Sequence, residues 1–155
     1  MARLTKGDEA PDLEASDGEG KTWKLSDLRG KKVILYFYPA DDTPGCTVEA
    51  CDFRDNMTSL DEAGYLVLGV SPQGAASHKR FAEKYGLNFP LLVDEDLAIA
   101  KAYGALKEEP EVWENVRLHV ARSTFVIDEN GVIEEALYKV GSKGHVAQLR
   151  ESIGV

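Results

Sequence analysis

Two cysteines lie close together in the sequence, and they are the only cysteines in the chain. Cys46 follows the turn-forming residues Thr43, Pro44 and Gly45, and Cys51 comes five residues later. A thiolate is a nucleophile, and the unpaired N–H groups and dipole of a helix N-terminus favour it over the thiol. A cysteine at the junction of a strand and a helix is therefore well placed to react.

Four interpretations of this pair compete. A zinc site usually needs four ligands, and the histidines of the chain, His78, His119 and His145, are scattered. A permanent structural disulfide is uncommon in a reducing cytosol. Free cysteine is often simply buried, which explains Cys51 well but explains Cys46, next to its turn, poorly. We therefore favour redox catalysis.

The residues before Cys46 suit a reactive thiol. Thr43 can direct its hydroxyl at the sulfur or at a substrate oxygen, and Pro44 and Gly45 shape the approach. Because Gly45 has no Cβ, a small substrate can come close to the backbone there. No histidine lies nearby in the sequence to act as a base. We therefore expect a positive charge from elsewhere in the chain to assist.

The spacing of the cysteines carries a second prediction. Five residues of regular helix correspond to about 7.5 Å of rise and about 140° of rotation, so the two Cα atoms lie roughly 8.6 Å apart. A disulfide tolerates a Cα separation of at most about 7 Å. If Cys46 and Cys51 pair, the first turns of the helix must unwind.

The bulk properties narrow the possible functions. The chain has 155 residues, of which 43% are hydrophobic and 29% charged, and it fits one globular domain spanning 1–155. Its formal net charge of −9 argues against nucleic acid and anionic membrane surfaces as partners. Residues 1–8 contain no apolar run typical of a signal peptide, and no segment approaches the length of a membrane span. We expect a cytoplasmic protein.

Strands and helices alternate along the chain and must position the cysteines. The run at 33–38 is apolar throughout, rich in β-branched and aromatic residues, and typical of a strand buried on both faces. The other predicted strands are 13–16, 22–25, 66–71, 91–93, 123–128 and 132–140. The predicted helices are 46–60, 75–85, 96–103 and 143–153. This order predicts an α/β fold, with an N-terminal β-hairpin and a mixed central sheet flanked by helices.

These residues carry a resemblance to a known family. The spacing Pro39-x3-Thr43-x2-Cys46, followed by Glu49, resembles the active-site motif of peroxiredoxins. With Cys51 included, the longer segment 36–51 resembles the bacterioferritin comigratory protein, or peroxiredoxin Q, branch. Further matching segments are 69–71, 77–87, 102–104 and 122–128. The resemblance extends from about residue 4 to residue 154.

The resemblance implies a thioredoxin-like fold and a thiol peroxidase that reduces hydrogen peroxide and organic hydroperoxides in antioxidant defence. Cys46 would be the peroxidatic cysteine and would become a sulfenic acid. Cys51 would resolve it as an intramolecular Cys46–Cys51 disulfide. Thioredoxin, or a similar dithiol protein, would restore both thiols, and no metal or organic cofactor would be required. A resolving cysteine in the same chain points to a monomer.

Further site residues carry over position by position. Thr43 and Arg122 would hold the thiolate and the peroxide oxygens, together with backbone N–H groups at Gly45 and Cys46. Pro39 would shield the pocket, and Glu49 would orient arginine side chains. The alternative for Arg122 is a surface cation at the start of a strand.

Two rival functions stay open beside peroxidase activity. A general disulfide oxidoreductase usually carries Cys-x-x-Cys, whereas four residues separate the cysteines here. A non-catalytic redox sensor or binding protein could use the same pair. Catalytic turnover separates these functions, because a sensor is oxidised without cycling rapidly.

The segment 107–116 departs from the family pattern, because it is acidic where relatives usually carry basic, Gly- and Tyr-containing sequence. We expect it to form a loop beside the active site. Trp113 within it either shapes an apolar rim or packs on the body of the domain.

Overall fold

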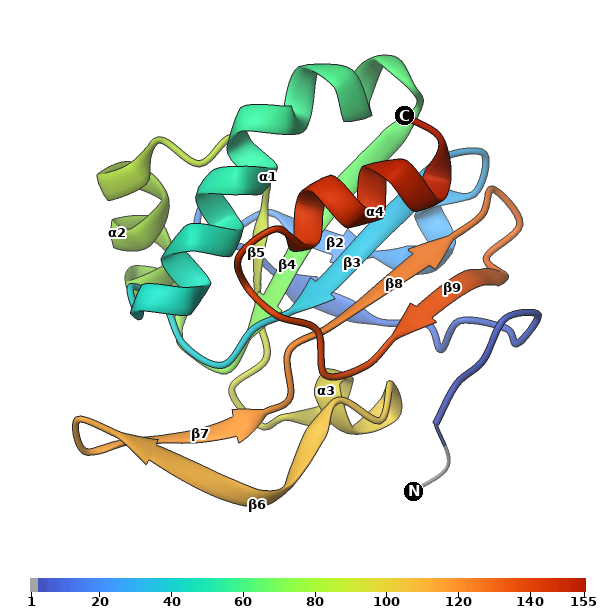
Figure 1. The fold of residues 1–155 in the computed structure, drawn as a ribbon. Helices are drawn as coiled ribbons and strands as arrows, with labels where there is room; N and C mark the ends of the chain where they lie inside the picture. Colours follow the sequence, from blue (N-terminus) through green and yellow to red (C-terminus); the bar gives the residue numbers. More distant parts are fainter. Residues whose placement is uncertain (1–2) are drawn as a thin grey trace.

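A five-stranded mixed sheet forms the centre of the protein in a computed structural model that describes residues 3–155 (Figure 1). Its strands, in spatial order, are β5 (Leu91–Val93), β4 (Tyr65–Ser71), β3 (Lys32–Phe37), β8 (Ser123–Ile127) and β9 (Ile133–Leu137). β3, β4 and β5 run parallel, whereas β8 is antiparallel to both β3 and β9. The predicted mixed central sheet is confirmed.

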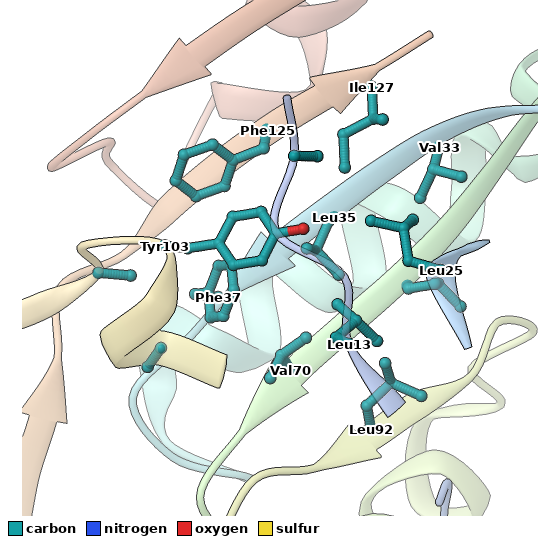
Figure 2. Close-up of a cluster of buried hydrophobic side chains, with 14 of the residues drawn as sticks. Leu13, Leu25, Val33, Leu35, Phe37, Val70, Leu92, Tyr103, Phe125 and Ile127 are labelled. Atoms are coloured by element: carbon teal, nitrogen blue, oxygen red, sulfur yellow. The ribbon is translucent and has the colours of Figure 1, made fainter. Parts of the chain in front are cut away.

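Central strand β3 is buried on both faces, as its apolar sequence predicted. Because side chains alternate along a strand, Val33, Leu35 and Phe37 enter one core layer, and Ile34 and Tyr36 enter the other. Figure 2 shows the first layer, where Phe37 and Phe125 of the sheet pack around Tyr103. The second layer contains the site described below.

Helices α1 (Pro44–Glu62), α2 (Ala75–Tyr85) and α4 (His145–Ile153) pack with the second layer, and the short α3 (Ala98–Ala102) packs with the first. Figure 1 shows α1 and α4 side by side across one face of the sheet. Helix α1 begins at Pro44, two residues before the predicted start at Cys46, because proline suits the first helical turn. α2 ends as predicted at Gly86, whose φ of 61° lies in the left-handed region.

The N-terminal hairpin of β1 (Glu14–Ser16) and β2 (Thr22–Lys24) confirms the prediction from the Gly-rich turn between them. A single 3₁₀ turn, η1 (Leu25–Leu28), follows it and was not predicted. Leu13, just before the hairpin, and Leu25, in the 3₁₀ turn after it, pack in the first core layer (Figure 2). Within residues 3–155, no helix is both long enough and apolar enough to cross a bilayer.

The acidic segment 107–116 does not form the loop that the sequence analysis expected. It belongs to a β-hairpin of β6 (Leu106–Trp113) and β7 (Val116–Val120), which extends away from the central sheet in Figure 1. The two turn residues, Glu114 and Asn115, have φ values of 44° and 69°, as a tight two-residue hairpin turn requires. A break in register between Leu106 and Glu111 accommodates Pro110. The expected position beside the predicted site residues is correct, as the cavity described below shows.

Candidate active site

Cys46 lies in the first turn of α1 and is buried, with 2% of its surface exposed. Thr43 is the N-cap and has extended backbone angles, so the chain leaves β3, turns at residues 38–43 and enters the helix. The first N–H groups of a helix lack intrahelical acceptors. The sulfur is therefore held where backbone donors and the helix dipole favour a negative charge.

Arg122 supplies the positive charge that the sequence analysis expected from elsewhere in the chain. It directly precedes β8, and the antiparallel pairing of β8 with β3 brings it to the edge of the sheet at which α1 begins. Its Nη2 donates to the Sγ of Cys46 at 3.4 Å. Arg122 is therefore not a free surface cation but a donor to the thiol.

Glu49 holds the other side of the same guanidinium. Its Oε1 accepts a hydrogen bond from Nη1 of Arg122 at 2.6 Å, and its side chain has no exposed surface. Burial raises the pKa of Glu49 to about 7, with Arg122 opposing the rise. Burial disfavours the charged guanidinium, but the negative charges of Glu49 and Cys46 outweigh this and raise the pKa of Arg122.

Thr43 does not cap the helix with its side chain. Its Oγ1 instead donates to the carbonyl oxygen of Ala40 at 2.8 Å. The hydroxyl proton is thereby used, and the oxygen keeps lone pairs that can accept a hydrogen bond from a peroxide O–H. In this arrangement the Thr43 oxygen is free to act as an acceptor toward a further partner.

Gly45 makes room for Arg122. A Cβ at this position would lie 3.1 Å from Nη2 of Arg122 and 3.3 Å from Oγ of Ser142. The sequence analysis assigned Gly45 to close approach of a substrate, and the structure shows close approach of the arginine. Ser142, in the segment before α4, is a neighbour of the site that the sequence analysis missed.

A cavity of about 790 Å³ lies beside Arg122. Pro39 and Ala121 line it on the body of the protein, and residues of β6, among them Leu106 and Glu108, line it on the hairpin. Cys46 itself is buried and does not line this cavity. Trp113 is 37% exposed and does not line the cavity either, so it forms no rim there.

Cys51 lies further along α1 and is partly exposed, and both cysteines are free thiols. Both belong to one continuous helix, so the roughly 8.6 Å estimated between their Cα atoms applies to this state. The structure therefore represents a reduced protein whose thiols cannot bond without local rearrangement.

A polar network holds the loop that leads into α1. Asp41 accepts hydrogen bonds from the Tyr38 hydroxyl at 2.6 Å and the Ser77 hydroxyl at 2.8 Å, and its Oδ2 lies 2.6 Å from Nδ1 of His78. The neighbouring Asp42, with a φ of 57°, accepts from Lys84 at 2.7 Å. Sequence reasoning missed these contacts, because their only signal was a pair of acidic residues after a strand.

A second polar group lies between the sheet and helices α1 and α4. Tyr36 of β3 pairs in register with Thr124 of β8, and Thr124 Oγ1 lies 2.8 Å from Nε2 of His145 at the start of α4. Burial, with the charge of Arg122 adding to it, lowers the pKa of His145 to about 4. His145 is therefore neutral near pH 7. In the sequence, the sign that Tyr36 could have a polar role was its hydroxyl group, in a run of residues that is otherwise mostly apolar.

The described part of the chain contains no cluster of three or more histidine, cysteine, aspartate or glutamate side chains suited to a metal ion.

Comparison with known proteins identifies the family of this chain. The model of the AhpC/TSA family matches residues 6–136. A putative peroxiredoxin of Mycobacterium tuberculosis is 47% identical over 153 residues, which cover 99% of this chain and 97% of the relative. Peroxiredoxin Bcp of Bacillus subtilis is 44% identical over 95% of this chain and 93% of its own.

Solved structures give the same result. A mutant of PrxQ from Xylella fastidiosa superimposes with a TM-score of 0.90 at 30% identity, covering 99% of this chain and 98% of that one. Peroxiredoxin Q of Xanthomonas campestris gives 0.83 at 34% identity, covering 92% and 90%. The expected thioredoxin-like fold is confirmed. The chain therefore belongs to the AhpC/TSA family, on its peroxiredoxin Q and Bcp branch, and is a thiol peroxidase.

Proposed function

We propose that Cys46 is the peroxidatic cysteine and that it reduces hydrogen peroxide and alkyl hydroperoxides. The observation that carries the proposal is the guanidinium of Arg122, which reaches the sulfur of Cys46 at 3.4 Å while Glu49 fixes its other nitrogen. Alkyl peroxide reduction is named for a related protein, the bacterioferritin comigratory protein of Xanthomonas campestris.

The chemical step is a displacement at oxygen. The Cys46 thiolate attacks the terminal peroxide oxygen, an S–O bond forms, and the O–O electron pair leaves with the second oxygen. That oxygen departs as hydroxide or alkoxide and takes up a proton to give water or an alcohol, while Cys46 becomes a sulfenic acid. Arg122 and the N–H groups of Gly45 and Cys46 stabilise the charge that grows on the leaving oxygen. Thr43 accepts a hydrogen bond from the peroxide, and Pro39 limits access of water.

Resolution follows within the same chain. The first turns of α1 unwind, the thiolate of Cys51 attacks the sulfur of the Cys46 sulfenic acid, and a disulfide forms as water leaves. A dithiol protein, which we propose is thioredoxin, then supplies two electrons by thiol–disulfide exchange and returns both cysteines to thiols. Because the cycle needs one chain and a reducing partner, we propose that the protein works as a monomer in the cytoplasm.

The test is a coupled assay of NADPH oxidation with thioredoxin, thioredoxin reductase and hydrogen peroxide at pH 7. Wild type should turn over steadily, and Cys46→Ser should be inactive. Cys51→Ser should reduce one equivalent of peroxide and then stall. Full thioredoxin-linked turnover by Cys51→Ser would refute its resolving role. Oxidation of Cys46 without turnover, with alkyl peroxides and other dithiol donors also failing, would favour a redox sensor.

A further inference from the structure

Two buried side-chain atoms lack a hydrogen-bond partner within residues 3–155: the hydroxyl oxygen of Tyr36 and Oε2 of Glu49. Buried polar atoms in proteins are almost always paired, and an exception calls for an explanation. Both atoms belong to the layer beneath α1 that also contains Cys46. The two exceptions therefore both fall in the part of the core that contains Cys46.

The surrounding packing brings Tyr36 toward Glu49. The Tyr36 ring stacks on Phe53 with 4.5 Å between centroids, and Phe53 lies one helical turn after Glu49 on the buried face of α1. Burial, followed by the negative charges of Glu49 and Cys46, raises the pKa of the Tyr36 hydroxyl well above its ordinary value. Burial thus favours the neutral phenol of Tyr36, which lies within electrostatic reach of the Glu49 carboxylate.

The fold also reserves space for this tyrosine. Gly69 of β4 pairs in register with Tyr36. A Cβ on Gly69 would lie 3.1 Å from two atoms of the Tyr36 ring and 2.9 Å from Cδ2 of Leu91. A glycine in the interior of a strand weakens the strand unless another group needs the room. The ring of Tyr36 and the side chain of Leu91 share this room.

We propose that Tyr36 is a positioning residue for the peroxidase site, whose hydroxyl donates to Oε2 of Glu49 through one buried water molecule. A water between two polar atoms with no other partner satisfies both. Glu49 would then be held at both oxygens, by Arg122 on Oε1 and by Tyr36 on Oε2. The inference rests on the proposed role of Cys46, because the benefit of fixing Glu49 is a fixed Arg122 beside that sulfur.

A hydrogen-bond donor at Oε2 should change the pKa of Glu49. A hydrogen bond to a carboxylate favours its charged form, and the pKa of Glu49 falls. Arg122, Asp52 and Tyr36 interact electrostatically with Glu49, and Cys46 and His145 interact with Arg122, the ion-pair partner of Glu49. His145 is neutral near pH 7, so Arg122 is the positively charged group among these residues. Tyr36 is the neutral hydroxyl donor among them.

The direct test is a ¹³C NMR titration of the Glu49 carboxyl in the reduced protein, with the resonance assigned by Glu49→Gln. Tyr36→Phe keeps the ring and removes only the hydroxyl, and it should raise the pKa of Glu49 by roughly 0.5–1 unit. Tyr38→Phe is the matched control: Tyr38 directly follows β3, and its hydroxyl donates to Asp41 at 2.6 Å instead. It should leave the Glu49 titration in place. An unchanged Glu49 pKa in Tyr36→Phe overturns the proposal.

A double-mutant cycle tests the positioning itself. Tyr36→Phe should slow oxidation of Cys46 by hydrogen peroxide several-fold at pH 7 and move the acid limb of the rate profile to higher pH. In a Glu49→Gln background the same change should have no further effect. Additive effects of the two substitutions would show that Tyr36 does not act through Glu49. If wild type itself does not react with peroxide, the proposed function fails, and the NMR titration still decides the role of Tyr36.

A crystal structure of the reduced protein gives an independent result that needs no variant. A water within hydrogen-bond distance of both the Tyr36 hydroxyl and Oε2 of Glu49 is expected. A dry gap between the two atoms would overturn the bridge.

Discussion

Arg122 and Glu49 form a buried ion pair, with 2.6 Å between Nη1 and Oε1, and the second terminal nitrogen of the same guanidinium reaches Cys46 at 3.4 Å. The two contacts use the planar fork of arginine, whose donors have a fixed relative direction. Glu49 therefore fixes the orientation of the Arg122 guanidinium, and this orientation places Nη2 where it donates to the Cys46 sulfur. A lysine has one charged nitrogen and cannot serve both partners in this geometry.

The first prediction concerns that fork. Arg122→Lys keeps the positive charge but should slow the reaction of Cys46 with hydrogen peroxide by roughly 100-fold, the typical effect of removing one transition-state donor. Stopped-flow tryptophan fluorescence of the reduced protein measures the rate. Arg80→Lys, on the exposed surface of α2, is the control and should react at the wild-type rate. A wild-type rate for Arg122→Lys would show that charge alone suffices.

The second prediction concerns stability and pH. Burial raises the pKa of Glu49 from 4.5 to about 7 in the folded protein. Folding therefore favours the protonated carboxyl, and this contribution is present below pH 4.5 and disappears as pH rises through 7. The free energy of unfolding of wild type should fall relative to that of Glu49→Gln over this range, by up to about 3 kcal/mol.

Urea unfolding of both reduced proteins at pH 5 and pH 8 measures this difference. His145, whose pKa burial lowers to about 4, titrates in both proteins, so its effect cancels in the comparison. Parallel stability profiles for wild type and Glu49→Gln would mean that Glu49 ionises with an ordinary pKa.

Much of this architecture was predictable because the run at 33–38 that forms most of β3 is apolar and the cysteine motif is specific. The sheet and the N-terminal hairpin followed from such local patterns. The β6–β7 hairpin did not, because its turn uses Glu114 and Asn115 instead of glycine and Pro110 interrupts its first strand. The acidic composition suggested a loop, but residues 111–113 pair antiparallel with 116–118 across the turn and form strands.

The inner details of the site depend on three-dimensional packing and were not predictable. Apolar character alone does not mark the buried face of α1, because Val48 is 42% exposed. The buried face instead contains Cys46, Glu49, Ala50 and Phe53. A buried glutamate is favourable there only because Arg122 arrives from β8, a partner 73 residues away in the sequence. The single-domain organisation and the roles of the individual site residues stay predictions.

The third prediction uses this helix face. Phe53 is fully buried against Tyr36, with 4.5 Å between ring centroids, whereas Val48 lies on the exposed face. Phe53→Ala should lower the free energy of unfolding by about 3–5 kcal/mol through the cavity it leaves. Val48→Ala, the control on the same helix, should change it by no more than about 0.5 kcal/mol. Urea unfolding of the two variants checks both values, and similar losses would place α1 in a different rotation.

The fourth prediction separates two roles of Thr43. Its hydroxyl donates to the Ala40 carbonyl at 2.8 Å and leaves lone pairs for a substrate. Thr43→Val has the same shape but should lose about 1–3 kcal/mol of stability, because the Ala40 carbonyl is left unpaired. It should also react with peroxide about tenfold more slowly. Thr43→Ser restores the hydroxyl and should recover both properties. A slow Thr43→Ser variant would show that the methyl group, not the hydroxyl, is needed.

The fifth prediction concerns the change in α1 between redox states. In the regular helix the Cα atoms of Cys46 and Cys51 lie roughly 8.6 Å apart, beyond the approximate 7 Å limit for a disulfide. Oxidation to the Cys46–Cys51 disulfide must therefore break helical hydrogen bonds between these positions. Amide hydrogen exchange at residues 47–53 should accelerate in the oxidised protein, because those N–H groups lose their acceptors.

Helix α2 (Ala75–Tyr85) provides an internal reference, since it contains neither cysteine and should keep its protection in both states. The Cys51→Ser variant, treated with one equivalent of peroxide, should keep the reduced pattern at 47–53, because its sulfenic acid has no partner in the helix. Once mass spectrometry has verified the disulfide in wild type, equal protection of 47–53 in both states would mean that α1 accommodates the bond without unwinding. The resolving step would then need a different geometry from the one that the helix imposes.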